Sequence, residues 1–189
     1  MKEGYHHGDL KRELVERGIQ IISEGGLEAF SLRALATRCG VSHNAVYRHF
    51  ASKEALIDCC RTHVTEELTA ALDRTADEAA DTSGGELAYR LGVTYVAFYE
   101  AHPTYYSPRF RNTACRLVIG LEEQAEEYPP FAFFRRAFAE QAERGILSDE
   151  EALRRLARYW AVLHGTIAVL VSPRAELRCP WREYLRDMV

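Results

Sequence analysis

The stretch from Ser31 to Lys53 constrains this chain most, because it combines helix and turn signals at a fixed spacing. Ser42 precedes a short helical pattern, and a serine oxygen there can accept a hydrogen bond from a free N–H of the first turn. Ala36, Gly40 and Val46 have the spacing of a helix-turn-helix, in which a small residue, a turn glycine and a β-branched core residue let two helices cross closely. The pattern therefore predicts two short helices joined by a tight turn.

The same stretch is basic, although the protein as a whole is acidic. The 189-residue chain has a formal net charge of −4, yet no Asp or Glu occurs between Ala29 and Lys53. The basic side chains of this segment are Arg33, Arg38, Arg48, Lys53, His43 and His49. Attraction to phosphate depends on the local field, so the segment predicts a surface that binds nucleic acid. If Val46 points inward, then its neighbours Ser42, His43, Asn44, Tyr47 and Arg48 point outward.

The sequence GVSHNAVYRHFASKEAL, preceded by SLRALATRC, resembles the DNA-binding domain of the tetracycline-repressor family of bacterial regulators. The resemblance runs from about residue 5 to about residue 68 and includes Tyr-x-His-Phe at 47–50 and Lys-Glu-Ala-Leu at 53–56. The opening YHHGDL, together with Trp160, His164 and Gly165, resembles a subgroup with a Trp-His-Gly motif in its C-terminal domain.

We expect His43 and Asn44 to contact base edges, with Arg33 reaching the DNA from the preceding helix. Asparagine suits adenine and arginine suits guanine, because each can make two hydrogen bonds to that base. The resemblance implies phosphate contacts for Tyr47, His49 and Lys53. Arg48 could contact either base edges or phosphate. For His49, the alternative is packing beside the first helix. The predicted DNA-binding residues are Arg33, Ser42, His43, Asn44, Tyr47, Arg48, His49 and Lys53.

Composition predicts a soluble, globular, cytoplasmic protein without a membrane partner. Hydrophobic residues make up 47% of the chain and charged residues 28%, while the longest uncharged run, 159–173, is too short to span a bilayer. Charges recur throughout residues 2–17, so we expect no signal peptide. Five irregularly spaced cysteines argue against a disulfide framework. Cys59, Cys60 and His63 suggest zinc, but a fourth ligand is missing, so we expect no metal site.

Helical periodicity accounts for the rest of the chain, and no strand-like alternation occurs. We expect a long helix from Ser52 to about residue 80, a polar linker at 81–85, an aromatic helix ended by Pro103, and a helix near 111–127. Two further helices should begin at Pro129 and at the capping box 148–151. The prediction is an all-α fold with three parts: a three-helix helix-turn-helix DNA-binding domain at 1–52, a connecting helix at 53–80, and a helical effector-binding and dimerisation domain at 81–189.

The last long helix carries two apolar stripes. One is large and heptad-like, and the other is small: Ala157, Ala161, Gly165 and Ala168. A helix that is apolar on two sides must be buried on both, so we expect a second copy of the chain to cover one of them. The alternative is a central helix of a monomeric core. The predicted dimer-interface residues are Phe138, Leu156, Ala157, Ala161, Leu163 and Ala168.

The resemblance also implies a small-molecule pocket in the C-terminal domain, in which ligand binding tilts the connecting helix and moves the two reading helices out of register with DNA. Aromatic residues with a few polar tips could line such a cavity, although the alternative is an ordinary aromatic core. The candidate pocket residues are Tyr95, Phe98, Tyr99, His102, Tyr105, Tyr106, Phe110, Phe134, Trp160 and His164.

We therefore expect a DNA-binding transcriptional regulator: a ligand-responsive repressor that binds a palindromic operator as a homodimer. Repression, as opposed to activation, follows from the resemblance alone. The alternative is a small-molecule-binding or catalytic all-α protein without operator specificity, in which His102, Tyr105 and His164 would form an acid–base group. The chain shows no Gly-rich phosphate loop and no nucleophile elbow, so we expect neither a catalytic residue nor a cofactor.

Overall fold

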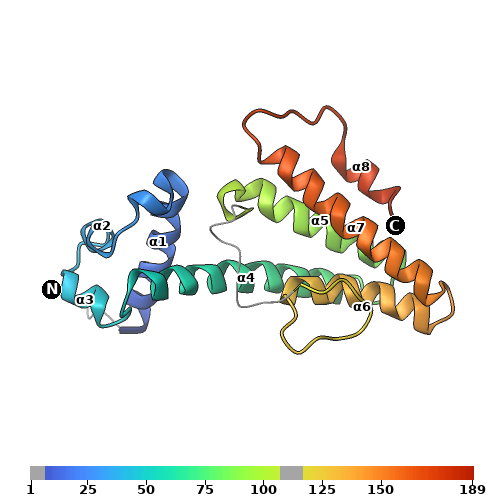
Figure 1. The fold of residues 1–189 in the computed structure, drawn as a ribbon, viewed down its shortest axis with the longest axis horizontal. Coiled ribbons are helices and arrows are strands. Elements are labelled where there is room, and N and C mark those ends of the chain that lie inside the picture. Colours follow the sequence, from blue (N-terminus) through green and yellow to red (C-terminus); the bar gives the residue numbers. More distant parts are fainter. Residues whose placement is uncertain (1–6, 107–116) are drawn as a thin grey trace. The chain divides into compact units, whose positions relative to one another are not determined.

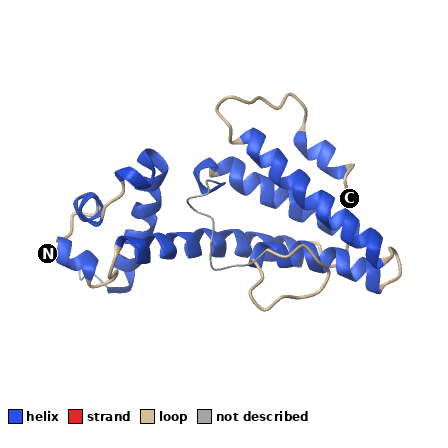
Figure 2. Cartoon of the chain, viewed as in Figure 1, coloured by secondary structure: helices blue, strands red, loops and turns tan. Residues whose placement is uncertain are grey.

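The computed structural model describes residues 7–106 and 117–189, which form eight α-helices, one short 3-10 helix and no strand within those ranges (Figures 1 and 2). This confirms the predicted all-α class. The chain folds into two compact units: unit 1 comprises residues 7–64, and unit 2 comprises residues 65–106 and 117–189 of the described chain. The candidate pocket residue Phe110 lies outside the described residues.

Unit 1 is built from α1 (His7–Ala29), α2 (Leu32–Arg38), α3 (His43–Tyr47) and the first half of α4 (Lys53–Glu78). Apolar residues that recur every three or four positions face one another in its core. The most deeply buried of them are Leu14, Phe30, Leu35, Val46, Leu56 and Cys60. The core therefore joins all four helices, and α2 and α3 rest on α1 and α4 through it.

The turn between α2 and α3 has the predicted geometry. Gly40 adopts φ 64, which is the left-handed conformation that glycine tolerates best, and the amide of Val41 donates to the carbonyl of Ala36 at 3.0 Å. The hydroxyl oxygen of Ser42 accepts a hydrogen bond from the amide of Ala45 at 3.2 Å, so the predicted cap is confirmed. Together these contacts form the helix-turn-helix.

Unit 2 contains the second half of α4, then α5 (Gly84–Ala101), η1 (Pro103–Tyr106), α6 (Pro129–Glu143), α7 (Asp149–Leu170) and α8 (Trp181–Arg186). Helices α5, α6 and α7 pack on one another around a largely aromatic core (Figure 1). The N-cap half of the capping box predicted at the start of α7 is present, since the Ser148 hydroxyl accepts from the amide of Glu151 at 3.3 Å. The Glu151 carboxylate instead accepts from Arg155 at 2.8 Å.

Helix α4 runs without interruption from Lys53 to Glu78, and the two units divide within it, between Val64 and Thr65. Its first half contributes Leu56 and Cys60 to the core of unit 1, whereas Leu68 and Leu72 belong to the aromatic core of unit 2. One continuous helix therefore supplies core residues to both units.

The helix expected near 111–127 is wrong for the part that the structure describes, because residues 117–127 are irregular. Leu117 and Ile119 remain 45% and 42% exposed, so a helix here would not gain the burial that stabilises helices in proteins. The segment is held at its end by Glu127, whose carboxylate accepts hydrogen bonds at 2.7 and 3.1 Å from Arg135 of α6. Both of these side chains are only 8% exposed.

Candidate nucleic-acid interface

Helix α3 buries one face and exposes the other. Ala45 and Val46 are buried against the rest of unit 1, whereas the side chains on the opposite face are open to solvent. The exposed residues are Ser42, His43, Asn44, Tyr47 and Arg48. The inward position expected for Val46 is confirmed, and the face that follows from it carries a hydroxyl, an imidazole, an amide, a phenol and a guanidinium. These are groups that can bind base edges and phosphate oxygens.

His43 and Tyr47 lie one helical turn apart and pack against each other. Their ring centroids are 4.8 Å apart and the ring planes are nearly perpendicular, at 88°. Tyr47 nevertheless remains 48% exposed, which is unusual for so large an aromatic side chain. The pair therefore offers an aromatic surface on the exposed face. His49, two residues after Tyr47, is half-buried.

Two arginines near this face are available for a partner. Arg33, on α2, and Arg48, just after α3, are exposed, and neither forms an ion pair with any other described residue. An exposed cation without a protein partner keeps its attraction for phosphate. Arg33 and Arg48 therefore supply the positive charge of the α2–α3 surface.

Arg38 does not add to this surface as the sequence suggested. Its guanidinium donates to both carboxylate oxygens of Glu24, at 2.7 and 2.8 Å. Glu24 lies 14 residues earlier, in α1, and so outside the acid-free segment. The fold thus neutralises one of the cations counted in that segment, and only the three-dimensional structure shows it.

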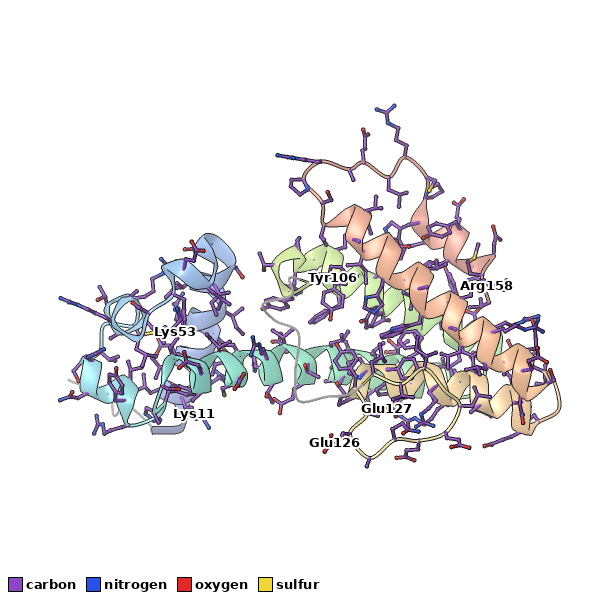
Figure 3. The ribbon with its side chains drawn as sticks, in the orientation of Figure 1. Lys11, Lys53, Tyr106, Glu126, Glu127 and Arg158 are labelled. Carbon is purple, nitrogen blue, oxygen red and sulfur yellow. The ribbon has the colours of Figure 1, made fainter. Side chains whose placement is uncertain are left out.

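Lys53 is also bound within unit 1 (Figure 3). Its ammonium donates to the carbonyl oxygen of Leu27 at 2.7 Å and lies 5.7 Å from the centroid of the Phe30 ring. The phosphate contact of Lys53 stays a prediction, and the structure places its ammonium against the end of α1. No local sequence signal pairs Lys53 with a backbone carbonyl 26 residues away.

In unit 2, part of the predicted pocket set forms a tightly packed aromatic core. Tyr95 is the centre of this cluster: its ring lies 5.3 Å from that of Tyr99, 5.6 Å from Phe134 and 5.2 Å from Trp160, measured between centroids. All four side chains are buried. Burial also raises the pKa of Tyr95 well above its ordinary value.

His164 of α7 connects this core to η1. The Tyr106 hydroxyl lies 2.9 Å from Nδ1 of His164 and donates to the His164 carbonyl at 3.0 Å, while the Tyr95 hydroxyl lies 3.3 Å from Nε2. An imidazole protonated on Nδ1 alone can donate to Tyr106 and accept from Tyr95. The network also extends to Tyr128, whose hydroxyl lies 3.4 Å from that of Tyr99 and which sequence reasoning missed.

The remaining predicted pocket residues form a second group. His102 stacks on Tyr105 with centroids 4.8 Å apart, and Phe98 contacts both rings. His102 is exposed, and Phe98 and Tyr105 are half-buried. The three residues of the suggested acid–base group therefore fall into two separate contacts. His102 stacks on Tyr105, whereas His164 bonds to Tyr106 and Tyr95.

The predicted dimer interface needs correction. Phe138, Leu156 and Leu163 are almost completely buried in the core of unit 2, so they are not on the surface of the protomer. Ala161 and Ala168 are exposed, and Ala157 is half-buried. The large stripe of α7 packs inside its own unit, because α5 and α6 already cover it. Only the small stripe is left on the surface.

Within the described residues, no three His, Cys, Asp or Glu side chains converge as metal ligands. Cys60 is instead buried, and its thiol donates to the carbonyl of Val15 at 3.6 Å. Burial raises the pKa of the Cys60 thiol to about 12. No helix in the described ranges has both the length and the apolar content needed to cross a bilayer.

Curated relatives match less than half of the chain. The HTH-type transcriptional repressor Rv3405c of Mycobacterium tuberculosis is 31% identical over 83 residues, which is 41% of this chain and 44% of that protein. The nicotine-responsive transcriptional repressor HdnoR of Paenarthrobacter nicotinovorans is 27% identical over 83 residues, covering 44% of this chain and 42% of its own length. The match thus spans less than half the length of these curated relatives.

The likeness in fold extends over the whole chain. A solved structure of a protein of unknown function from Rhodococcus sp. RHA1 has a TM-score of 0.77 and 25% sequence identity, covering 98% of this chain and 94% of that one. Both units therefore have the fold of a known structure.

The family relationship rests on the helix-turn-helix described above. The family model for bacterial regulatory proteins of the tetR family matches residues 14–59, which include α2, α3 and the start of α4. The same region carries the exposed α3 face and the Gly40 turn. This part of the chain is therefore similar to the tetR family of bacterial regulatory proteins.

Proposed function

We propose that this protein is a DNA-binding transcriptional regulator: a ligand-responsive repressor that acts in the cytoplasm and binds a palindromic operator as a homodimer. The observation that carries the proposal is the exposed face of α3 in a segment without acidic residues. It is accompanied by the guanidinium groups of Arg33 and Arg48, which form no ion pair with a described residue. Such a surface attracts the DNA backbone and presents hydrogen-bonding groups to a major groove.

Within this face, Asn44 and Arg33 have the side chains best suited to base reading. The Asn44 amide can both donate to and accept from adenine, and the guanidinium of Arg33 can donate twice to guanine. Each such pair contributes about 1–3 kcal/mol of discrimination against the wrong base. Arg48 follows α3 and supplies charge for phosphate. The hydroxyl of Ser42 already accepts a hydrogen bond from the amide of Ala45. We therefore assign Ser42 first to capping α3 and only second to contacting DNA.

A single helix-turn-helix contacts few base pairs, and two copies related by a two-fold axis give a usable site. The small stripe of α7, at Ala157, Ala161, Gly165 and Ala168, supports a surface for the second copy. These side chains are short and three of the four positions are exposed, so the backbone of another helix can approach closely. Leu153, at the same face and 38% exposed, adds apolar area.

The effector would bind in unit 2, where aromatic rings and a few polar tips gather around His164. The relative named as nicotine-responsive supports a small organic molecule as the class of effector. The second aromatic group, Phe98 with His102 and Tyr105, is more exposed to solvent than the buried core around Tyr95. Its exposure supports this group as the place where an effector would enter unit 2.

The test is binding of the purified protein to duplexes that tile the DNA upstream of its own gene, followed by protection mapping of any duplex that is retained. We expect one palindromic site to be protected, with an affinity that falls steeply as salt rises. A double variant that carries both Asn44→Ala and Arg48→Ala should lose that protection while keeping the helical content of the unaltered protein. Equal and weak binding to every duplex would contradict the proposal and favour an all-α protein without operator specificity.

A further inference from the structure

Lys53 occupies the first position of α4, and its charge is held inside unit 1 (Figure 3). The ammonium donates to the Leu27 carbonyl at 2.7 Å, a short distance for an N–H···O bond, and the ring of Phe30 lies close beside it. Hydrogen bonds from charged donors are stronger than neutral ones, and a cation near an aromatic face gains further attraction. The ammonium therefore has a specific binding site within the protein.

The acceptor lies at the end of α1. Gly26, with φ 73 and ψ −179, interrupts α1 just before Leu27. The last carbonyl groups of a helix lack partners along the helix and need another donor. The Lys53 ammonium supplies one to Leu27. This bond joins the end of the first helix to the start of the fourth.

Helices α2 and α3 lie entirely between these two points in the sequence. Leu27 and Lys53 are 26 residues apart, and the segment between them contains the Gly40 turn and the exposed face of α3. Bringing the ends of a segment together costs conformational entropy, and a bond between the ends offsets part of that cost. The Lys53–Leu27 bond therefore closes the base of the helix-turn-helix.

We propose that Lys53 is a positioning residue for DNA recognition: it holds α2 and α3 in the arrangement that presents the α3 face, and does so by binding α1 and not by contacting phosphate. This inference rests on the proposed function and replaces the phosphate contact that the resemblance implies. Without the bond, the arrangement able to bind DNA is less populated, and the apparent affinity falls by the same fraction.

The two roles differ in their response to salt. A phosphate contact releases counterions, so its loss lowers the slope of log Kd against log salt by about 0.9. Lys53→Met keeps the length of the side chain but removes its charge and its donors. We expect the full-length variant to bind a retained upstream duplex about tenfold more weakly, consistent with loss of one charged hydrogen bond, at an unchanged slope. The matched control Arg48→Met removes an exposed cation that has no ion-pair partner among the described residues, and it should lower the slope.

A slope in Lys53→Met that falls as far as it does in Arg48→Met would overturn the proposal, since the ammonium would then be a phosphate contact. Lys53→Arg provides the conservative variant, because a guanidinium can still donate to Leu27. It should restore most of the affinity lost in Lys53→Met. If Lys53→Arg folds normally in unit 1 but does not restore the affinity, that result would also count against the positioning role of the Lys53–Leu27 bond.

Amide hydrogen exchange tests the effect of the Lys53–Leu27 bond on α2 and α3 without DNA. In Lys53→Met we expect the amides of residues 32–47 to exchange about tenfold faster, while those of α5 to α7 are unchanged. Lys53→Arg should return them to the original rates. Unchanged exchange in Lys53→Met would overturn the proposal whatever the DNA result. A different outcome would be faster exchange in Lys53→Met while the unaltered protein binds no duplex. That outcome would overturn the proposed function but support the role of the Lys53–Leu27 bond between α1 and α4.

Discussion

Tyr159 of α7 lies directly against Gly92 of α5, and its hydroxyl donates to the carbonyl of Ala88 at 3.1 Å. A methyl group at position 92 would overlap the phenol of Tyr159 and crowd Leu163. The close crossing of α5 and α7 thus depends on a residue without a side chain. The same contact buries Tyr159 completely and raises the pKa of its phenol well above the ordinary value.

Gly92→Ala should therefore destabilise unit 2 by about 1–3 kcal/mol, the usual cost of overpacking a well-filled core. Thermal and urea unfolding measure it. The control is Gly85→Ala in the same helix, where an added Cβ meets nothing within 4 Å. That change should leave stability the same or raise it slightly, because alanine favours the helix. Equal stabilities for the two variants would show that α5 and α7 are not in close contact at Gly92.

Asn44→Ala should cost about 1–3 kcal/mol in affinity for the protected operator and much less for random DNA. The reason is that Asn44 is exposed on the α3 face and carries the amide best suited to adenine. Titration of both duplexes at one salt concentration gives the comparison. Equal losses on the two kinds of DNA would remove Asn44 from base reading and leave it with a general contact.

Ala161→Arg should lower the mass observed by analytical ultracentrifugation from dimer to monomer, since a long charged side chain would separate two copies packed through the small stripe of α7. Leu163→Arg should instead unfold unit 2, because Leu163 is fully buried there. An unchanged mass for Ala161→Arg, with normal helical content, would exclude the small stripe as the interface.

Stability of unit 1 should fall as the pH rises above about 9, the ordinary pKa of a thiol. Burial raises the pKa of Cys60 to about 12 in the folded protein, so the unfolded chain loses its thiol proton first. Between these values the folded state binds more protons, and the free energy of unfolding decreases with pH. Urea unfolding at several pH values should show a shallower decrease for Cys60→Ala. Cys59→Ala, at the half-buried neighbour, should keep the original slope.

Local signals in the sequence were enough to predict the helix-turn-helix. The cap at Ser42, the left-handed turn at Gly40 and the buried side of α3 at Val46 each depend on residues within one or two helical turns. Backbone conformation and short-range hydrogen bonds decide such features, so composition and spacing predict them. The exposed face of α3 follows from the same periodicity, as does the all-α class.

The partners of the charged side chains came only from the tertiary structure. Arg38 meets Glu24 and Lys53 meets Leu27, at separations of 14 and 26 residues, and neither pairing leaves a periodic trace in the sequence. The same holds for α7: its sequence shows two apolar stripes, but only the packing of α5 and α6 decides that Leu163 is interior and Ala161 is surface. Periodicity identifies the faces of a helix, whereas what covers each face depends on contacts between distant segments.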